Sequence, residues 1–181
     1  MTLIIVDAGH GPNTAGKRSP DGKLREFTFN NAVATEIQKL LLSQKINVFM
    51  THETTRDVPL AERMKRANAH KGDAFISIHA NAFTSKWHTA NGIETYIKRA
   101  ASKEEKSLAA TIQQALVAKT GLRNRGVKQE NFYVLTNAKM PAILVECGFM
   151  TNKKEVALLA SANYQKQCAK AIVQGLMEWL K

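Results

Sequence analysis

Short apolar runs alternate with amphipathic stretches along the chain. Continuous apolar runs, typical of strands buried on both faces, occupy residues 3–6, 46–50, 74–78 and 142–145. Two less regular strand candidates are residues 92–97 and 132–135. Apolar residues recur at helical spacing within residues 29–41, 60–67, 108–116 and 168–180. This β-α-β alternation predicts one α/β domain over residues 1–181, with a mainly parallel sheet and helices on both faces.

Three side chains that can do chemistry stand at the ends of predicted strands. His10 and His79 each come directly after an apolar run, and Glu146 ends a third run. In open sheets of this kind ligands bind beyond the carboxyl ends of the strands, so these side chains are expected to converge there. A carboxylate at the end of a buried strand is costly unless it meets a metal, a cation or a role as a base. We therefore interpret Glu146 as a functional residue.

The two histidines predict a metal site. Two neutral imidazoles are good Zn²⁺ ligands, and a catalytic zinc site needs a third protein ligand and an open position. Glu26, at the end of a turn-rich loop and just before a predicted helix, is the natural third ligand. The sequence leaves Asp7 and Asp21 as alternative carboxylates.

The remaining histidines and the cysteines are not assigned a role in chemistry. His52 also follows a strand, but polar residues surround it, so it is expected at the surface. His70 and His88 lie in no supporting pattern and are expected to be solvated. Cys147 and Cys168 are expected to be free thiols, because a domain of this size folds without disulfides.

The chain is strongly basic, with 26 Lys and Arg against 15 Asp and Glu and a net charge of +11. This charge favours an anionic partner such as a cell wall, a membrane or nucleic acid, although a solvated basic surface without a partner would show the same charge. No signal peptide is visible and no apolar run approaches the length of a membrane span. We therefore expect a soluble protein that is either cytoplasmic or exported by a route that leaves no mark on the sequence.

Five sequence blocks together resemble the zinc-dependent N-acetylmuramoyl-L-alanine amidases of autolysins and phage endolysins. The blocks are IVDAGHG at 5–11, LRE at 24–26, LAERMKRAN at 60–68, ISIHAN at 76–81 and LVECGFMTN at 144–152. The resemblance implies a mixed sheet of about six strands, zinc on His10, Glu26 and His79, and Glu146 as the catalytic acid and base. The chain departs from the commoner pattern at residues 12–23, which form a longer, basic, turn-rich segment, and at Phe27, where a lysine is frequent.

The activity that this resemblance implies is hydrolysis of the bond between N-acetylmuramic acid and L-alanine by zinc-activated water. Two other functions stay open from the sequence: a zinc peptidase or carboxypeptidase of similar fold, and a non-catalytic basic module that binds wall polymer. The expected partner is peptidoglycan, with no nucleic acid and no membrane, and the expected state is a monomer. The resemblance, together with the missing signal peptide, implies an enzyme that acts on the cell wall. Such an enzyme would be made in the cytoplasm and released by lysis or through a holin lesion, or the chain is an excised domain.

Overall fold

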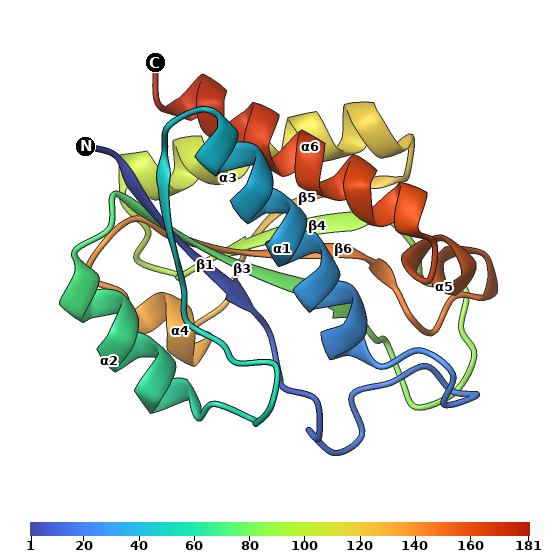
Figure 1. Cartoon of the computed structure of the whole chain (residues 1–181). Coiled ribbons are helices and arrows are strands. Elements are labelled where there is room, and N and C mark those ends of the chain that lie inside the picture. The colour runs from blue at the N-terminus through green and yellow to red at the C-terminus, as the bar shows by residue number, and fades with distance from the viewer.

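A computed structural model describes residues 1–181, and its six strands form one sheet in the order β2-β1-β3-β6-β4-β5 (Figure 1). The strands are β1 (Leu3–Ala8), β2 (Asn47–Met50), β3 (Ala74–Asn81), β4 (Ile93–Ile97), β5 (Asn124–Gln129) and β6 (Ala142–Phe149). Strands β2, β1, β3 and β6 are mutually parallel, whereas β4 runs antiparallel to β6 and β5 runs parallel to β4. The predicted α/β class and mixed six-stranded sheet are confirmed.

Six helices cover the sheet unequally. They are α1 (Glu26–Ser43), α2 (Leu60–His70), α3 (Lys103–Thr120), α4 (Tyr133–Thr136), α5 (Lys153–Leu159) and α6 (Ala162–Trp179). Figure 1 shows α1, α3 and α6 on one face and the shorter α2 and α4 on the other. None of the helices combines the length and apolarity needed to cross a membrane.

The alternation of side chains along each strand divides the apolar residues between two cores. In β1, Ile4 and Val6 join a core of 33 buried residues beneath α1, α3 and α6. Ile5 points the other way, into a core of 9 buried residues shared with α2 and α4. The smaller core leaves part of its face of the sheet without a helical cover, and the candidate site lies there.

Helix α3 shows how local sequence sets the ends of an element. Ser102 and Glu105 form a capping box, in which each side chain accepts a hydrogen bond from the other residue's backbone N–H. Gly121 ends the helix in the left-handed conformation, which glycine adopts without steric cost. Sequence periodicity and capping thus agree at this helix.

One strand prediction is wrong. Residues 132–135 do not form a strand, because Val134 and Leu135 bury themselves in the smaller core from the single turn of α4. The sixth strand, which the sequence did not predict, is β5, whose sequence NRGVKQ shows no apolar alternation. As the outermost strand it bonds only to β4 and keeps its polar side chains at the surface, which protects an exposed sheet edge from further pairing. The short helix α5 was not predicted either, and Asn152 caps it.

Candidate functional site

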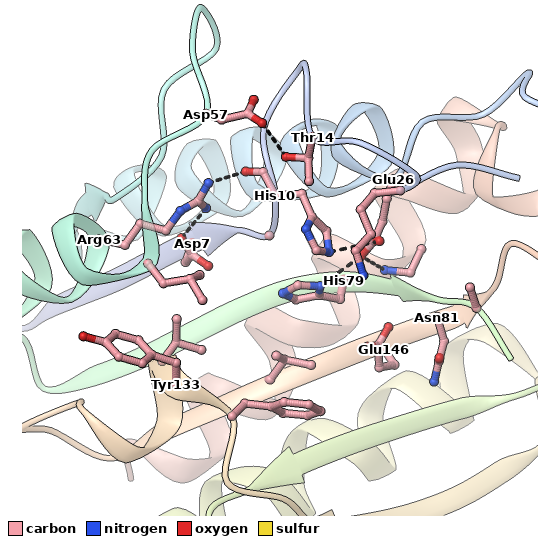
Figure 2. Close-up of a pocket in the computed structure, with 18 of the residues that line it drawn as sticks. Asp7, His10, Thr14, Glu26, Asp57, Arg63, His79, Asn81, Tyr133 and Glu146 are labelled. Carbon is pink, nitrogen blue, oxygen red and sulfur yellow. Dashed lines mark hydrogen bonds and ion pairs between the residues drawn. The ribbon is translucent and has the colours of Figure 1, made fainter. Parts of the chain in front are cut away.

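His10, Glu26 and His79 come together as expected (Figure 2). The Glu26 carboxylate lies between the rings, with Oε2 3.1 Å from His10 Nε2 and Oε1 2.9 Å from His79 Nδ1. One ligand atom from each residue lies within 4.8 Å of the other two. Two imidazoles and one carboxylate are a recognised donor set for Zn²⁺ that leaves a position open for water or substrate. The group therefore fits a catalytic zinc ion.

The end of β1 is shaped to bring His10 and His79 into contact. Gly9 carries no side chain, and a Cβ at this position would collide with the His79 ring. His10 adopts a left-handed conformation with φ 63°, which is uncommon for a residue with a side chain. The buried Arg63 guanidinium donates to the carbonyl oxygens of Ala8 and His10 and so holds this turn. Arg63 thus positions a candidate ligand through its backbone.

Glu26 is the first residue of α1 and is buried. Burial alone would raise the pKa of its carboxyl, but the hydrogen bonds and charges of His10 and His79 hold the pKa well below its usual range. The backbone N–H of Ala80 also donates to Glu26 Oε1 at 3.3 Å. In turn, Glu26 raises the pKa of His79 against the opposing effect of burial.

Glu146 lies on β6 directly opposite His79 in the parallel register of β3 and β6. Its Oε2 atom is buried and has no hydrogen-bond partner. Burial raises the pKa of Glu146 to about 8, with the charge of His79 opposing the shift and those of Glu26 and Glu94 adding to it. A carboxyl of this kind can exchange a proton near neutral pH.

The two alternative carboxylates have other partners. Asp7 is buried and accepts hydrogen bonds from Arg63, Thr51 and Ser77 at 2.8, 2.6 and 2.7 Å. Asp21 accepts a hydrogen bond from Ser19 at 2.6 Å within its own loop. Glu26 is therefore the carboxylate that meets the histidines.

A cleft of about 630 Å³ opens over this group. His10, Glu26, His79 and Glu146 all line it. The turn-rich loop contributes residues 14–17, of which Thr14 donates to Asp57 at 2.6 Å, and α4 contributes Tyr133 on the other side (Figure 2). The basic loop that sets this chain apart in sequence is thus a wall of the cleft.

The prediction for His52 is wrong. The side chain is buried, its Nδ1 accepts the Ala8 N–H at 3.1 Å, and its ring packs against Phe27. Because Nδ1 is an acceptor, Nε2 carries the proton and donates to Asn31 Oδ1 at 3.0 Å. Burial lowers the pKa of His52 and favours this neutral form. The polar neighbours in sequence concealed a histidine that supports the end of β1.

The other expectations for these residue types are confirmed. His70 and His88 are exposed, and both stack on exposed or half-buried phenylalanine rings. Cys147 and Cys168 are free and buried.

Four polar residues near the site were not identified by sequence reasoning. They are Arg63, Asn81, Glu94 and Arg125. Arg63 and Asn81 stand inside blocks that carried the family resemblance, but nothing in their spacing indicated a contact. Glu94 carried a weak signal, since it is an acidic residue at an inner position of a strand. Arg125 lies in the strand that was not predicted.

The sequence profile described as N-acetylmuramoyl-L-alanine amidase matches residues 4–178. The uncharacterized protein YqiI of Bacillus subtilis is 36% identical over 96% of this chain and 82% of its own length. The N-acetylmuramoyl-L-alanine amidase LytC of Bacillus subtilis is 34% identical over 98% of this chain. The chain spans only 35% of LytC and 57% of a probable cell wall amidase, LytH, of Staphylococcus epidermidis.

Solved structures agree with the sequence matches. An N-acetylmuramoyl-L-alanine amidase from Clostridium difficile 630 superimposes with a TM-score of 0.94 at 36% identity, over 99% of this chain and 96% of that one. The catalytic domain of CwlV, an amidase of Paenibacillus polymyxa, gives a TM-score of 0.90 at 35% identity, over 99% and 98%. With its strand order, its His, Glu and His group and matches that span nearly the whole sequence, this chain belongs to the N-acetylmuramoyl-L-alanine amidase family.

Proposed function

We propose that residues 1–181 form one catalytic domain that hydrolyses the amide bond between N-acetylmuramic acid and the L-alanine of the stem peptide. The observation that carries this proposal is the buried, unpartnered Glu146 oxygen beside the His10, Glu26 and His79 group in one cleft. Family membership supplies the substrate class, because the matching profile and solved relatives are N-acetylmuramoyl-L-alanine amidases.

His10, Glu26 and His79 would hold the zinc on which this family generally depends. When bound, zinc supplies Lewis acidity, which lowers the pKa of water from 15.7 toward about 7 and polarises a carbonyl group. Ligand histidines must be neutral to bind metal, so metal affinity declines as the pH falls.

Glu146 acts as the acid and base. It removes a proton from the attacking water, whose oxygen bonds to the carbonyl carbon of the muramic acid lactyl group. The same proton then passes from Glu146 to the nitrogen of L-alanine as the carbon–nitrogen bond breaks, leaving a carboxylic acid on the glycan and a free amine on the peptide. Burial favours this role, because a carboxyl with a raised pKa both accepts and returns a proton readily.

The partner in this proposal is peptidoglycan at the cell wall. The names of its relatives support this partner, since they include a probable cell wall amidase and an endolysin of Bacillus phage SPP1. The net charge of +11 favours association with a wall that carries phosphate and carboxylate groups. The catalytic domain is proposed to act as a monomer, because one chain supplies every residue of the site.

Digestion of purified sacculi, followed by mass spectrometry, tests the proposal. The amidase reaction releases stem peptides with a free L-alanine amine and leaves intact glycan strands. A free amine elsewhere in the peptide would instead identify a zinc peptidase, and binding to sacculi without cleavage by the zinc-loaded protein would identify a non-catalytic module. Metal analysis of the same preparations is expected to give zinc in the wild type and in Glu146→Ala, and none in His10→Ala or His79→Ala.

A further inference from the structure

A buried carboxylate, that of Glu94, lies beside Glu146. Glu94 of β4 is 1% exposed and is the cross-strand partner of Glu146 in the antiparallel pair of β4 and β6. Such partners have Cβ atoms about 4.5–5.5 Å apart, and like charges placed in this way repel each other. An ionised Glu94 therefore needs compensation from other groups.

Two cations from the edge strand β5 supply that compensation. Arg125 Nε donates to Glu94 Oε1, and Lys128 Nζ donates to the same oxygen at 2.6 Å. The other oxygen accepts hydrogen bonds from Tyr96 and Asn81, at 2.6 and 3.2 Å. Burial would raise the pKa of Glu94, but Lys128, Tyr96 and Arg125 outweigh it and keep the carboxylate ionised. One negative and two positive charges leave this cluster with a net charge of +1.

The cluster holds more donors than Glu94 can use. Arg125 bonds to Glu94 only through Nε, and its two terminal nitrogens have no acceptor in the protein. Its guanidinium lies 5.0 Å from the centre of the Phe149 ring, within the range of a cation–π interaction. Lys128 likewise donates to a single acceptor. Both side chains are partly exposed, at 22% and 36%. A guanidinium that is bonded through Nε, contacts an aromatic ring and keeps both terminal nitrogens free is well suited to bind a carboxylate.

Two residues that line the cleft connect it to this cluster. Asn81 faces the cleft (Figure 2) and donates to Glu94. Phe132 also lines the cleft and packs edge-on against Tyr96, with ring centres 5.1 Å apart. The free donors therefore stand next to the cleft on the Glu146 side.

The proposed reaction determines which part of the substrate lies there. Glu146 must reach the nitrogen of L-alanine in order to protonate it, and the stem peptide continues from that nitrogen. An extended peptide advances about 3.5 Å per residue, so a carboxylate on the second residue lies about 7 Å from the scissile bond. That distance lies between one step across the sheet from Glu146 to Glu94, about 4.8 Å, and the two steps to β5, about 9.6 Å, which carries the two cations.

The geometry points to a carboxylate-binding subsite for the stem peptide, formed by Arg125 and Lys128 on the support of Glu94. This inference rests on the proposed amidase function and adds a specificity to it. The subsite recognises a free carboxylate on the second residue of the stem and discriminates against the amidated form of the same residue.

Two soluble muropeptides test this subsite on the zinc-loaded enzyme. They differ only in whether the second stem residue carries a free carboxylate or its amide. The wild type is expected to cleave the carboxylate form with a kcat/KM about tenfold higher, which is the size of one charge-assisted hydrogen bond. Arg125→Gln is expected to remove this preference by raising KM for the carboxylate form alone, and Lys128→Gln to reduce it.

Two charge-matched variants serve as controls. Arg123→Gln removes an exposed cation two residues away, and Lys17→Gln removes a cation from the opposite loop of the cleft. Both are expected to retain the preference. The inference is overturned if the wild type cleaves both muropeptides equally, if Arg125→Gln slows both equally, or if the preference depends on Lys17 instead. Failure to cleave either muropeptide at the L-alanine bond would instead contradict the amidase function itself.

Discussion

The same strands of the sheet build two very different faces. The face beneath α1, α3 and α6 contributes to a core of 33 buried apolar residues. The face toward α2 and α4 buries only 9 apolar residues and carries most of the polar ones, namely Asp7, Ser77, His79, Glu94 and Glu146. Because side chains alternate along a strand, one run of sequence supplies both faces.

The comparison teaches how stability and chemistry are separated in this fold. The covered face gains from burying apolar surface, which is the main favourable contribution to folding. The open face contains groups that cost free energy unless they are paired, such as the unpartnered oxygen of Glu146. Substitutions on the open face are thus expected to change activity or the pairing of charges, and substitutions on the covered face to change stability alone.

The largest effect is expected from Glu146→Gln. This variant keeps the shape of the side chain but cannot carry the proton, so kcat should fall by about 10²- to 10⁴-fold. The free energy of unfolding should not decrease, because the variant replaces a carboxyl whose buried Oε2 atom has no hydrogen-bond partner. Steady-state kinetics, zinc analysis and urea unfolding measure the three quantities. A fully active Glu146→Gln enzyme would exclude the proposed acid and base.

The next effect concerns the charge pair that supports the open face. Arg63→Met leaves Asp7 buried without its cation and should lower the free energy of unfolding by about 3–5 kcal/mol. Zinc affinity should also fall, because Arg63 holds the carbonyl oxygen of His10. Urea unfolding of the metal-free and zinc-loaded proteins separates the two effects. The double variant with Asp7→Asn should recover part of the stability, and equal stabilities of single variant and wild type would contradict the role of the pair.

The covered face was the easier one to predict from sequence. Its strands are continuous apolar runs and its helices have clear periodicity, so β1, β3, β6, α1, α3 and α6 were all expected. The convergence of His10, His79 and Glu146 could also be predicted from the sequence, because parallel strands place their carboxyl ends at one edge of the sheet. Glu26 was already expected as the third candidate ligand, but excluding Asp7 required the tertiary structure, in which Arg63 pairs with Asp7 and the two histidines contact Glu26.

The parts that sequence did not reveal depend on contacts between distant residues. Strand β5 has no apolar alternation because it lies at the edge of the sheet. Its position next to β4 cannot be predicted from its residues. His52 has polar neighbours in sequence, yet the fold buries it against Phe27 and Ala8. Glu94 and Arg125 are 31 positions apart and meet only because β4 and β5 pair.

A smaller effect is expected when the pH falls. Burial would raise the pKa of Asp7, but the charge of Arg63 and hydrogen bonds from Thr51 and Ser77 outweigh it and lower the pKa. The unfolded chain, with an Asp pKa of about 3.9, then binds its proton at higher pH than the folded one. The contribution of Asp7 to stability is complete above that value and is lost as the pH falls through the folded pKa.

Unfolding of the metal-free protein as a function of pH measures this contribution without interference from zinc binding. The free energy of unfolding should decline below about pH 4, and Asp7→Asn should make that decline shallower. Asp57→Asn is a suitable control, because Asp57 is an exposed carboxylate bonded to Thr14 and Asn13. If Asp7→Asn and Asp57→Asn reduce the loss of unfolding free energy in acid equally, the buried pair of Asp7 and Arg63 contributes no more to acid stability than an exposed carboxylate does.

The smallest effect tests the covered face and the independence of the two faces. Ile143 is fully buried in the larger core, and Ile143→Val removes one methylene group. The free energy of unfolding should fall by about 1 kcal/mol through lost packing. The kcat/KM for muropeptides should stay unchanged, although the next residue, Leu144, lines the cleft. Urea unfolding and kinetics on the same preparation check both values. A marked loss of activity in Ile143→Val would mean that packing in the larger core affects the side chains of the cleft, so that the two faces of the sheet are not independent.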